Sequence, residues 1–160
     1  MIGVIMAGGK GTRLYPLTAN RPKPLVEVLG KPVVDYVSDA LLDAGITDVI
    51  LTTGYQGEGL ISLVEDWNNN KFGKFSVSNE DRPMGTAGSV KLLQDKLNET
   101  FIVASGDAIL SSNLRNLISA HKFSNAKVTM ALWEVDDPTQ FGIVGLSSQI
   151  GGQINPELSE

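Results

Sequence analysis

The feature that most constrains this chain is a regular alternation of short apolar runs with longer amphipathic stretches. Apolar runs of four to eight residues between turn residues are typical of buried strands, and apolar residues spaced at i, i+3 and i+4 predict helices. On this basis we expect strands at 2–6, 48–53, 75–78, 101–104, 127–135 and 143–146. We expect helices at 33–44, 60–67, 86–97 and 114–121.

Strands that alternate with helices predict an α/β fold, here a Rossmann-like three-layer sandwich with a mainly parallel sheet. In such sheets ligands bind beyond the carboxyl ends of the strands. Three unusual loops, 8–32, 79–86 and 105–112, each follow a predicted strand. We therefore expect these loops to meet at one edge of the sheet.

Charge and composition exclude several classes of function. The 160-residue chain carries a formal net charge of −5, and no run of Lys and Arg exceeds two residues, which argues against general nucleic-acid binding. It contains no cysteine, which excludes disulfides, zinc–thiolate sites and thiol nucleophiles. No apolar stretch is long enough to span a bilayer, and the N-terminus lacks the pattern of a signal peptide. We expect a cytoplasmic protein with no membrane partner.

A glycine-rich loop follows the first apolar run. Gly8, Gly9 and Gly11 would let the backbone approach a ligand and point N–H groups at phosphate oxygens. Lys10 and Arg13 add positive charge, and an arginine can contact a phosphate with two parallel hydrogen bonds. The spacing fits neither a dinucleotide fingerprint nor a P-loop. An ordinary glycine-rich turn after a strand is the alternative interpretation.

Lys23 is flanked by Pro22 and Pro24, which restrict the backbone on both sides. Such a lysine can be held over a phosphate, although a solvated loop lysine would have the same sequence context. Asp107 follows the predicted strand at 101–104 and could supply an oxygen ligand to a hard cation. An aspartate in an ordinary turn is the alternative there. His121, the only histidine, falls on an apolar helical face, so we expect a structural role for it.

Residues 8–32, GGKGTRLYPLTANRPKPLVEVLGKP, closely resemble the signature of the sugar-phosphate nucleotidyltransferases. The resemblance continues in the same order through nearly the whole chain. The residues of these segments are most similar to those of the mannose-1-phosphate guanylyltransferase branch. Its later matches are Tyr36, Ala44-Gly45-Ile46, Gly54-Tyr55, Gly85-Thr86-Ala87-Gly88, Ser105-Gly106-Asp107 and Phe141-Gly142-Ile143-Val144.

The resemblance implies an enzyme that transfers a nucleotidyl group from an NTP to a sugar 1-phosphate, giving an NDP-sugar and pyrophosphate. It implies Mg²⁺ as the cofactor, with Asp107 as its ligand, and Arg13, Lys23 and Asp107 as the catalytic residues. Gly142 would approach the sugar phosphate. The implied nucleotide-binding residues are Ala7, Gly8, Gly9, Gly11, Thr12, Arg13, Lys23, Glu80, Gly85 and Thr86.

Two alternatives stay open at this point: a glucose-1-phosphate thymidylyl- or uridylyltransferase, and a non-catalytic nucleotide-binding module. The family carries a Glu-Lys-Pro segment and a second metal-binding aspartate further along, but no lysine follows Lys127 and no aspartate follows Asp137 here. We therefore expect a fold truncated at its C-terminus, with 1–146 as the nucleotide-binding part. Residues 147–160 would be a polar tail at the start of the sugar-binding part. An unpaired sheet edge would favour a homo-oligomer.

Overall fold

The computed structural model describes residues 1–9, 11–54, 57–110, 113–137, 139 and 142–144. The chain divides into two compact units, Met1–Ser111 and Ser112–Glu160. A parallel sheet with strand order β5-β4-β1-β6 organises the first unit. Its strands are β1 (Ile2–Met6), β4 (Asp48–Thr53), β5 (Lys74–Asn79) and β6 (Phe101–Ser105). The predicted α/β fold with a mainly parallel sheet is confirmed, and the boundaries of these strands differ from the prediction by at most one residue.

Helices cover both faces of this sheet, as predicted for a three-layer arrangement. They are α1 (Val33–Asp43), α2 (Glu58–Asn70) and α3 (Gly85–Lys91). Helix α3 ends earlier than the prediction of 86–97, because the following residues form turns with bonds from Leu93 N–H to the Val90 carbonyl (3.0 Å) and from Lys96 N–H to the Leu93 carbonyl (2.8 Å). Leu93 is nevertheless 2% exposed, so the apolar side of this segment still faces the sheet.

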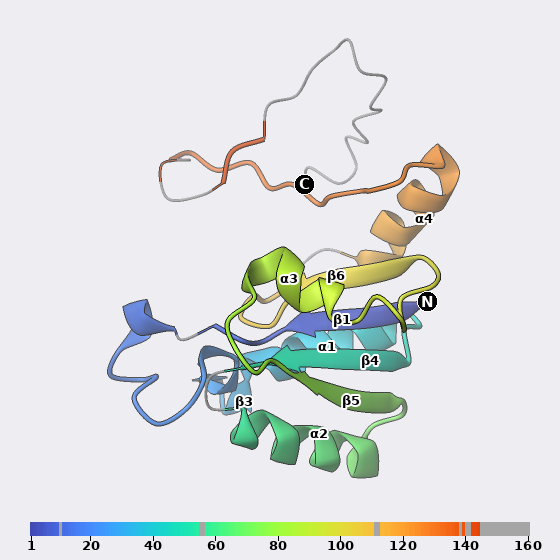
Figure 1. Cartoon of the computed structure of the whole chain (residues 1–160). Coiled ribbons are helices and arrows are strands. Elements are labelled where there is room, and N and C mark those ends of the chain that lie inside the picture. The colour runs from blue at the N-terminus through green and yellow to red at the C-terminus, as the bar shows by residue number, and fades with distance from the viewer. Residues whose placement is uncertain (10, 55–56, 111–112, 138, 140–141, 145–160) are drawn as a thin grey trace. The chain divides into compact units, whose positions relative to one another are not determined.

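Strand β1 shows how alternating side chains join the layers. A Cβ atom on Gly3 would lie 3.2 Å from Leu41 of α1, whereas the next residue, Val4, packs with Leu93 and Val90 on the opposite face. Successive residues of a strand point to opposite faces. Strand β1 therefore lies between α1 on one side and the α3 segment on the other, as Figure 1 shows.

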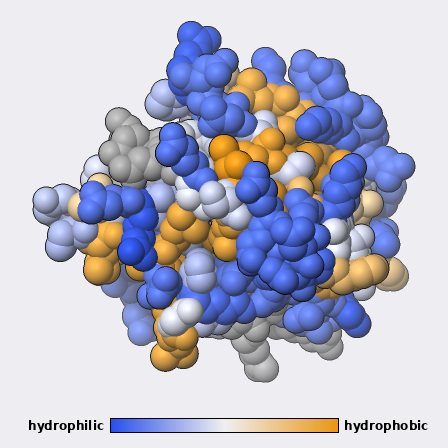
Figure 2. Space-filling view, turned by 90° about the horizontal axis from the view of Figure 1, so that it is seen from below, coloured by the Kyte–Doolittle hydropathy of each residue, from blue (hydrophilic) through white to orange (hydrophobic). Residues whose placement is uncertain are grey.

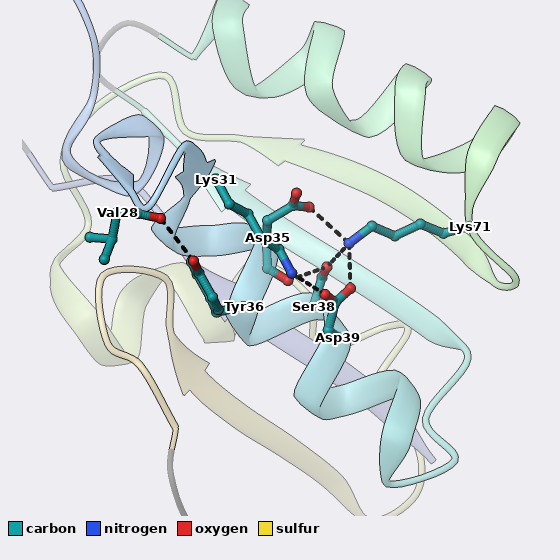
Figure 3. A network of polar contacts seen from close by, with 7 residues as sticks. All are labelled: Val28, Lys31, Asp35, Tyr36, Ser38, Asp39 and Lys71. Carbon is teal, nitrogen blue, oxygen red and sulfur yellow. Dashed lines mark hydrogen bonds and ion pairs between the residues drawn. The ribbon is translucent and has the colours of Figure 1, made fainter.

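The long loop after β1 is not a single irregular segment. It contains two 3-10 turns, η1 (Thr12–Leu14) and η2 (Lys23–Leu25), and a short antiparallel hairpin. The hairpin strands are β2 (Glu27–Val28) and β3 (Lys31–Pro32). The phenol of Tyr36 on α1 donates a hydrogen bond to the Val28 carbonyl (2.8 Å), which ties the hairpin to α1 (Figure 3).

A cluster of charges joins the end of α2 to α1. The Lys71 ammonium donates hydrogen bonds to Asp35 (2.8 Å), Ser38 (2.6 Å) and Asp39 (2.6 Å). Lys31 of the hairpin forms a second ion pair with Asp39. Figure 3 shows the two lysines approaching the same helix from different sides. These contacts couple α2, the hairpin and α1 in one network.

The second unit begins with α4 (Leu114–Ser124), where the Asn113 side chain accepts a hydrogen bond from the Arg115 N–H (2.9 Å) at the N-terminus. His121 is half-buried and its Nδ1 lies 2.9 Å from the Thr129 hydroxyl, a structural contact of the kind predicted for it.

The strand predicted at 127–135 is not observed. Alternation of apolar and polar residues creates a strand only when a neighbouring strand satisfies its backbone hydrogen bonds. No strand among the residues of known placement pairs with this segment, and Val128 and Met130 are 78% and 66% exposed. Of the strand predicted at 143–146, Ile143 and Val144 are not in a strand, and the other two residues lie outside the described part.

The surface seen from below Figure 1, from the side of α2, is largely hydrophilic with apolar groups between (Figure 2). Helix α2 explains part of this pattern, because it buries Leu60, Val64 and Trp67 and exposes most of its other residues. No helix in the described part of the chain is long and apolar enough to cross a membrane.

Candidate functional site

A pocket of about 760 Å³ lies at the carboxyl ends of the strands of the first unit. Figure 1 shows all of these strand ends on its left side, where the loops gather. The prediction that loops after the first, third and fourth strands meet at one sheet edge is therefore confirmed. The pocket is lined by Met6, Ala7, Gly8, Gly9, Lys23, Pro24, Thr52, Gly54, Glu80, Asp81, Arg82, Pro83, Gly85, Thr86, Ser89, Ser105 and Asp107.

An ion pair in the pocket joins Lys23 to Asp107. The Lys23 ammonium lies 2.5 Å from Oδ2 of Asp107, and the Ser105 hydroxyl donates a hydrogen bond to Oδ1. The two side chains of the ion pair are 35% and 33% exposed. Burial raises the pKa of Asp107, but the hydrogen bonds from Lys23 and Ser105 outweigh it, so the pKa lies below its ordinary value. Asp107 is thus held as a carboxylate.

Local structure explains why Lys23 reaches this position. The turn η2 is closed by hydrogen bonds from Leu25 N–H to the Pro22 carbonyl (2.9 Å) and from Val26 N–H to the Lys23 carbonyl (3.1 Å). Pro24, the middle residue of this turn, is buried. The flanking prolines restrict the backbone, and the turn is anchored to the hairpin that follows. The interpretation of Lys23 as a solvated loop residue is therefore not supported.

Gly11 brings the first loop against Lys23. Its φ is +62°, and a Cβ atom there would lie 2.8 Å from the Lys23 Cβ. The buried Thr18 donates a hydrogen bond from its hydroxyl to the Gly11 carbonyl (2.9 Å). A residue with a side chain would be strained at this φ and would collide with the lysine stem. The glycine turn and the lysine motif are thus parts of one local structure.

The predicted nucleotide-binding residues of the first loop divide into two groups. Ala7, Gly8 and Gly9 line the pocket, and Ala7 is fixed by a hydrogen bond from its N–H to the Thr52 carbonyl (2.9 Å). Gly11, Thr12 and Arg13 are not in the pocket wall, and Arg13 is exposed in η1. Lys10 lies outside the described residues. The roles of Thr12 and Arg13 remain predictions.

The loop after β5 forms the opposite wall. The Glu80 N–H donates to the Thr53 carbonyl (2.8 Å), and Oε2 of Glu80 accepts a hydrogen bond from the Met84 N–H (3.1 Å). This side-chain bond closes the turn from 80 to 84. Gly85, with a φ of +69°, and Thr86 follow at the start of α3 and line the pocket, as does Glu80. The structure therefore brings these three predicted residues to the same pocket as Lys23 and Asp107.

Sequence reasoning missed several members of the pocket wall: Thr52, Asp81, Arg82, Ser89 and Ser105. Ser105 could have been found, because it lies two residues before Asp107 and directly after the strand predicted at 101–104. Thr52 could not, because nothing in an apolar run distinguishes a threonine that faces the pocket. Its hydroxyl is buried and has no hydrogen-bond partner among the described residues.

The donor set at Asp107 fits one mode of Mg²⁺ binding. No group of three His, Cys, Asp or Glu side chains that could hold a metal occurs in the part of the chain that the structure describes. Mg²⁺, however, is commonly held by one or two carboxylates together with substrate phosphates and water. Asp107 offers one carboxylate in a pocket large enough for such a substrate. Gly142 belongs to the second unit, where it is exposed, and its predicted contact with a sugar phosphate remains a prediction.

A parallel sheet with a glycine turn after its first strand and a pocket at its carboxyl edge is the architecture of nucleotide-binding α/β domains. The chain belongs to the nucleotidyl transferase family, whose sequence pattern matches residues 2–155. The predicted resemblance is thereby confirmed.

Relatives at the level of sequence include a mannose-1-phosphate guanyltransferase from Saccharomyces cerevisiae. It is 36% identical over 147 residues, which make up 90% of this chain and 41% of that protein. The chain thus spans less than half the length of this relative.

Solved structures show the same likeness. A Bacillus anthracis protein assigned as a glucose-1-phosphate thymidylyltransferase and crystallised with sucrose matches with a TM-score of 0.79 at 28% identity, over 92% of this chain and 61% of that one. HddC from Yersinia pseudotuberculosis, complexed with GMP-PN, matches with a TM-score of 0.66 at 31% identity, over 75% of this chain and 53% of that one.

Proposed function

We propose that this chain binds a nucleoside triphosphate in the pocket at the sheet edge. Residues 1–146 would be the nucleotide-binding part of a sugar-phosphate nucleotidyltransferase of the mannose-1-phosphate guanylyltransferase type. The observation that carries the proposal is the meeting of Lys23, Asp107 and the glycine turn at Gly8 and Gly9 in one pocket. A cation, a metal-binding carboxylate and closely approachable backbone are the groups that a metal-bound triphosphate requires.

The arrangement of the strands supports one orientation of the nucleotide. Asp107 follows β6 and Glu80 follows β5, and these are the two outer strands of the sheet. Three interstrand spacings of about 4.8 Å place the two strand ends roughly 14 Å apart, which is comparable to the length of an extended nucleoside triphosphate. The phosphates would lie at the Lys23–Asp107 end, and the base would lie near Glu80, Gly85 and Thr86.

The chemistry we propose is phosphoryl-type transfer without a protein nucleophile. An oxygen of the sugar 1-phosphate would attack the α-phosphorus, a new phosphorus–oxygen bond would form, and pyrophosphate would leave with the electron pair of the broken bond. Lys23 and Arg13 would stabilise the charge that develops on the phosphate oxygens. The fixed pocket would supply alignment. Mg²⁺, held by Asp107 and the substrate phosphates, would neutralise phosphate charge when bound.

The contact between Lys23 and Asp107 implies an exchange of partners. Without a nucleotide, each neutralises the other across 2.5 Å. A bound triphosphate would offer Lys23 a stronger anion and would leave Asp107 available to the metal. Nucleotide and metal would therefore strengthen each other's binding, and by thermodynamic linkage this effect is reciprocal.

Thymidylyl or uridylyl transfer to glucose 1-phosphate is the second candidate, supported by the likeness to the Bacillus anthracis structure. Guanylyl transfer is favoured by the 36% identity to the yeast mannose-1-phosphate guanyltransferase. Gly142 would contribute to the sugar-phosphate site, and residues 147–160, which lie outside the described part, would begin the sugar-binding part. A nucleotide-binding module without turnover is the contrasting possibility for a chain of this length.

Calorimetric titration of the 160-residue chain with GTP, UTP and dTTP in the presence of Mg²⁺ tests the proposal. We expect saturable binding, tightest for GTP. Pyrophosphate release on addition of mannose 1-phosphate would support turnover by this chain. Nucleotide binding without pyrophosphate release would support the binding module, and absence of saturable binding by every nucleotide would contradict the proposed function.

A further inference from the structure

Arg82 is a second cation in the pocket wall, and unlike Lys23 it has no partner among the residues that the structure describes. Among the described residues that line the pocket, the cationic ones are Lys23 and Arg82. Lys23 is paired with Asp107, whereas no described residue forms a hydrogen bond or an ion pair with Arg82. The exposed guanidinium is therefore available to a ligand in this pocket.

The backbone that carries Arg82 is well defined. Glu80 is fixed to the end of β4 by its hydrogen bond to the Thr53 carbonyl (2.8 Å), and the Met84 N–H returns to the Glu80 carboxylate (3.1 Å). Pro83 restricts the backbone directly after Arg82. Arg82 thus lies midway in a closed turn, so its side chain starts from a fixed point on the pocket wall.

Position and charge favour a base over a phosphate as the partner of Arg82. This step rests on the proposed function, in which the phosphates lie at the β6 end of the pocket, beside Asp107. Arg82 follows β5, at the opposite end of the sheet edge. Glu80 and Asp81 line the pocket beside it, and their carboxylates would repel a triphosphate but not a neutral base.

The chemistry of a guanidinium selects among the bases. Its N–H groups are donors only, arranged as a fork that suits two neighbouring acceptors. Guanine presents such a pair at O6 and N7, whereas adenine presents an acceptor beside an amino donor and the pyrimidines have no N7. We propose that Arg82 recognises the O6 and N7 atoms of a guanine base and so determines the base specificity of this pocket.

The test compares GTP with 7-deaza-GTP, in which a C–H group replaces N7, and with UTP. Dissociation constants are measured by calorimetry with Mg²⁺ for the 160-residue chain, for Arg82→Gln and for Lys74→Gln. Lys74 is exposed at the opposite end of β5 and does not line the pocket. Its replacement is a control that removes the same charge at the other end of β5, away from the pocket.

We expect the unaltered chain to bind GTP more tightly than 7-deaza-GTP. Arg82→Gln should weaken GTP binding on the order of 5- to 150-fold, the range of a bidentate arginine–guanine contact. It should change the binding of 7-deaza-GTP much less and leave the binding of UTP close to that of the control.

Two outcomes overturn the inference while leaving nucleotide binding intact. If Arg82→Gln weakens the binding of all three nucleotides equally, the guanidinium contacts the phosphates and not the base. If it changes the dissociation constant of none of them, Arg82 does not contact the nucleotide. If the unaltered chain binds no nucleotide, the proposed function itself fails and the inference with it, so the two failures are distinguishable.

Discussion

The Lys23 ammonium and the Asp107 carboxylate lie 2.5 Å apart although 84 residues separate them in the chain. They reach the pocket by different routes, Lys23 through a proline-flanked turn after β1 and Asp107 through the end of β6. The pair joins the two segments that the sequence resemblance marks as catalytic. Because the two charges neutralise each other, the ability of either residue to bind an ion of opposite charge depends on the presence of the other.

Replacing Asp107 with asparagine should abolish the effect of Mg²⁺ on nucleotide binding. The amide has nearly the same shape but lacks the charge that a hard cation requires. We expect Mg²⁺ to strengthen GTP binding by the unaltered chain and to have little effect on Asp107→Asn, measured by calorimetry with and without the metal. Asp95→Asn, at an exposed position outside the pocket, is the control. An undiminished Mg²⁺ effect in Asp107→Asn would place the metal elsewhere.

The stability contributed by Asp107 should depend on pH in a defined direction. Its pKa in the folded chain lies below the ordinary value of 3.8, so the folded state favours the carboxylate. The contribution is therefore fully present above that ordinary value and is lost as the pH falls through the lower pKa of the folded state. Because the pair is one-third exposed, we expect at most about 1 kcal/mol.

Urea unfolding of the unaltered chain and of Asp107→Asn between pH 2 and pH 7 measures this contribution. The difference in the free energy of unfolding should be constant near neutral pH, should begin to shrink below the ordinary value of 3.8, and should disappear as the pH falls through the lower pKa of the folded state. A difference that grows as the pH falls would contradict the direction of the pKa shift.

Gly11→Ala should destabilise the chain and displace Lys23. The new methyl group would lie 2.8 Å from the Lys23 Cβ, at a φ of +62°. We expect a loss of about 1–3 kcal/mol in the free energy of unfolding and weaker GTP binding. Gly9→Ala is the matched control for stability, because no atom lies within 4 Å of the added Cβ. Equal free energies of unfolding for the two variants would show that the loop accommodates a side chain at position 11 beside Lys23 and would contradict this prediction.

Thr52→Val should stabilise the chain, whereas the same change at the next residue should destabilise it. The buried Thr52 hydroxyl has no partner among the described residues, and the Thr53 hydroxyl donates to Oδ1 of Asn79 (3.2 Å). Removing an unsatisfied hydroxyl should raise the free energy of unfolding by about 1 kcal/mol, and removing a bonded one should lower it by a similar amount. Chemical denaturation of both variants tests this, and destabilisation by Thr52→Val would show that its hydroxyl has a partner.

Lys71→Met should destabilise the junction between α1 and α2. The Lys71 side chain is 18% exposed and contacts both Asp35 and Asp39, whose repulsion would no longer be compensated. We expect a loss of about 1–3 kcal/mol, below the range for fully buried pairs. Lys91→Met, at an exposed position on α3, should change the free energy of unfolding by less than about 0.5 kcal/mol. Similar values for the two variants would contradict a stabilising role of the network.

Much of the first unit could be predicted from local sequence. Strands β1 and β4 are short apolar runs between turn residues, and the apolar residues of α1 have the spacing of a helix. Each of these patterns favours a single type of secondary structure. The strand expected at 127–135 failed because alternation describes only the side chains. A strand also needs a neighbour for its backbone, and no local pattern specifies that neighbour.

The candidate site divides in the same way. Gly8, Gly9, Lys23 and Asp107 were predicted because they occur together in an ordered motif, since each of them alone has an ordinary interpretation in its local context. Arg82 was not, since an exposed arginine in a loop is ordinary until the fold places it beside a pocket.

The sequence by itself therefore determined the α/β pattern and the family, and it supplied candidate residues for binding a triphosphate. Only the tertiary structure decided that Lys23 pairs with Asp107, that Gly11 packs against the lysine stem, and that Arg82 and Thr52 line the same pocket. The physical reason is that periodicity and turn chemistry act between near neighbours in the chain. Ion pairs and pockets depend on the order of strands in the sheet, which brings together residues that are distant in sequence.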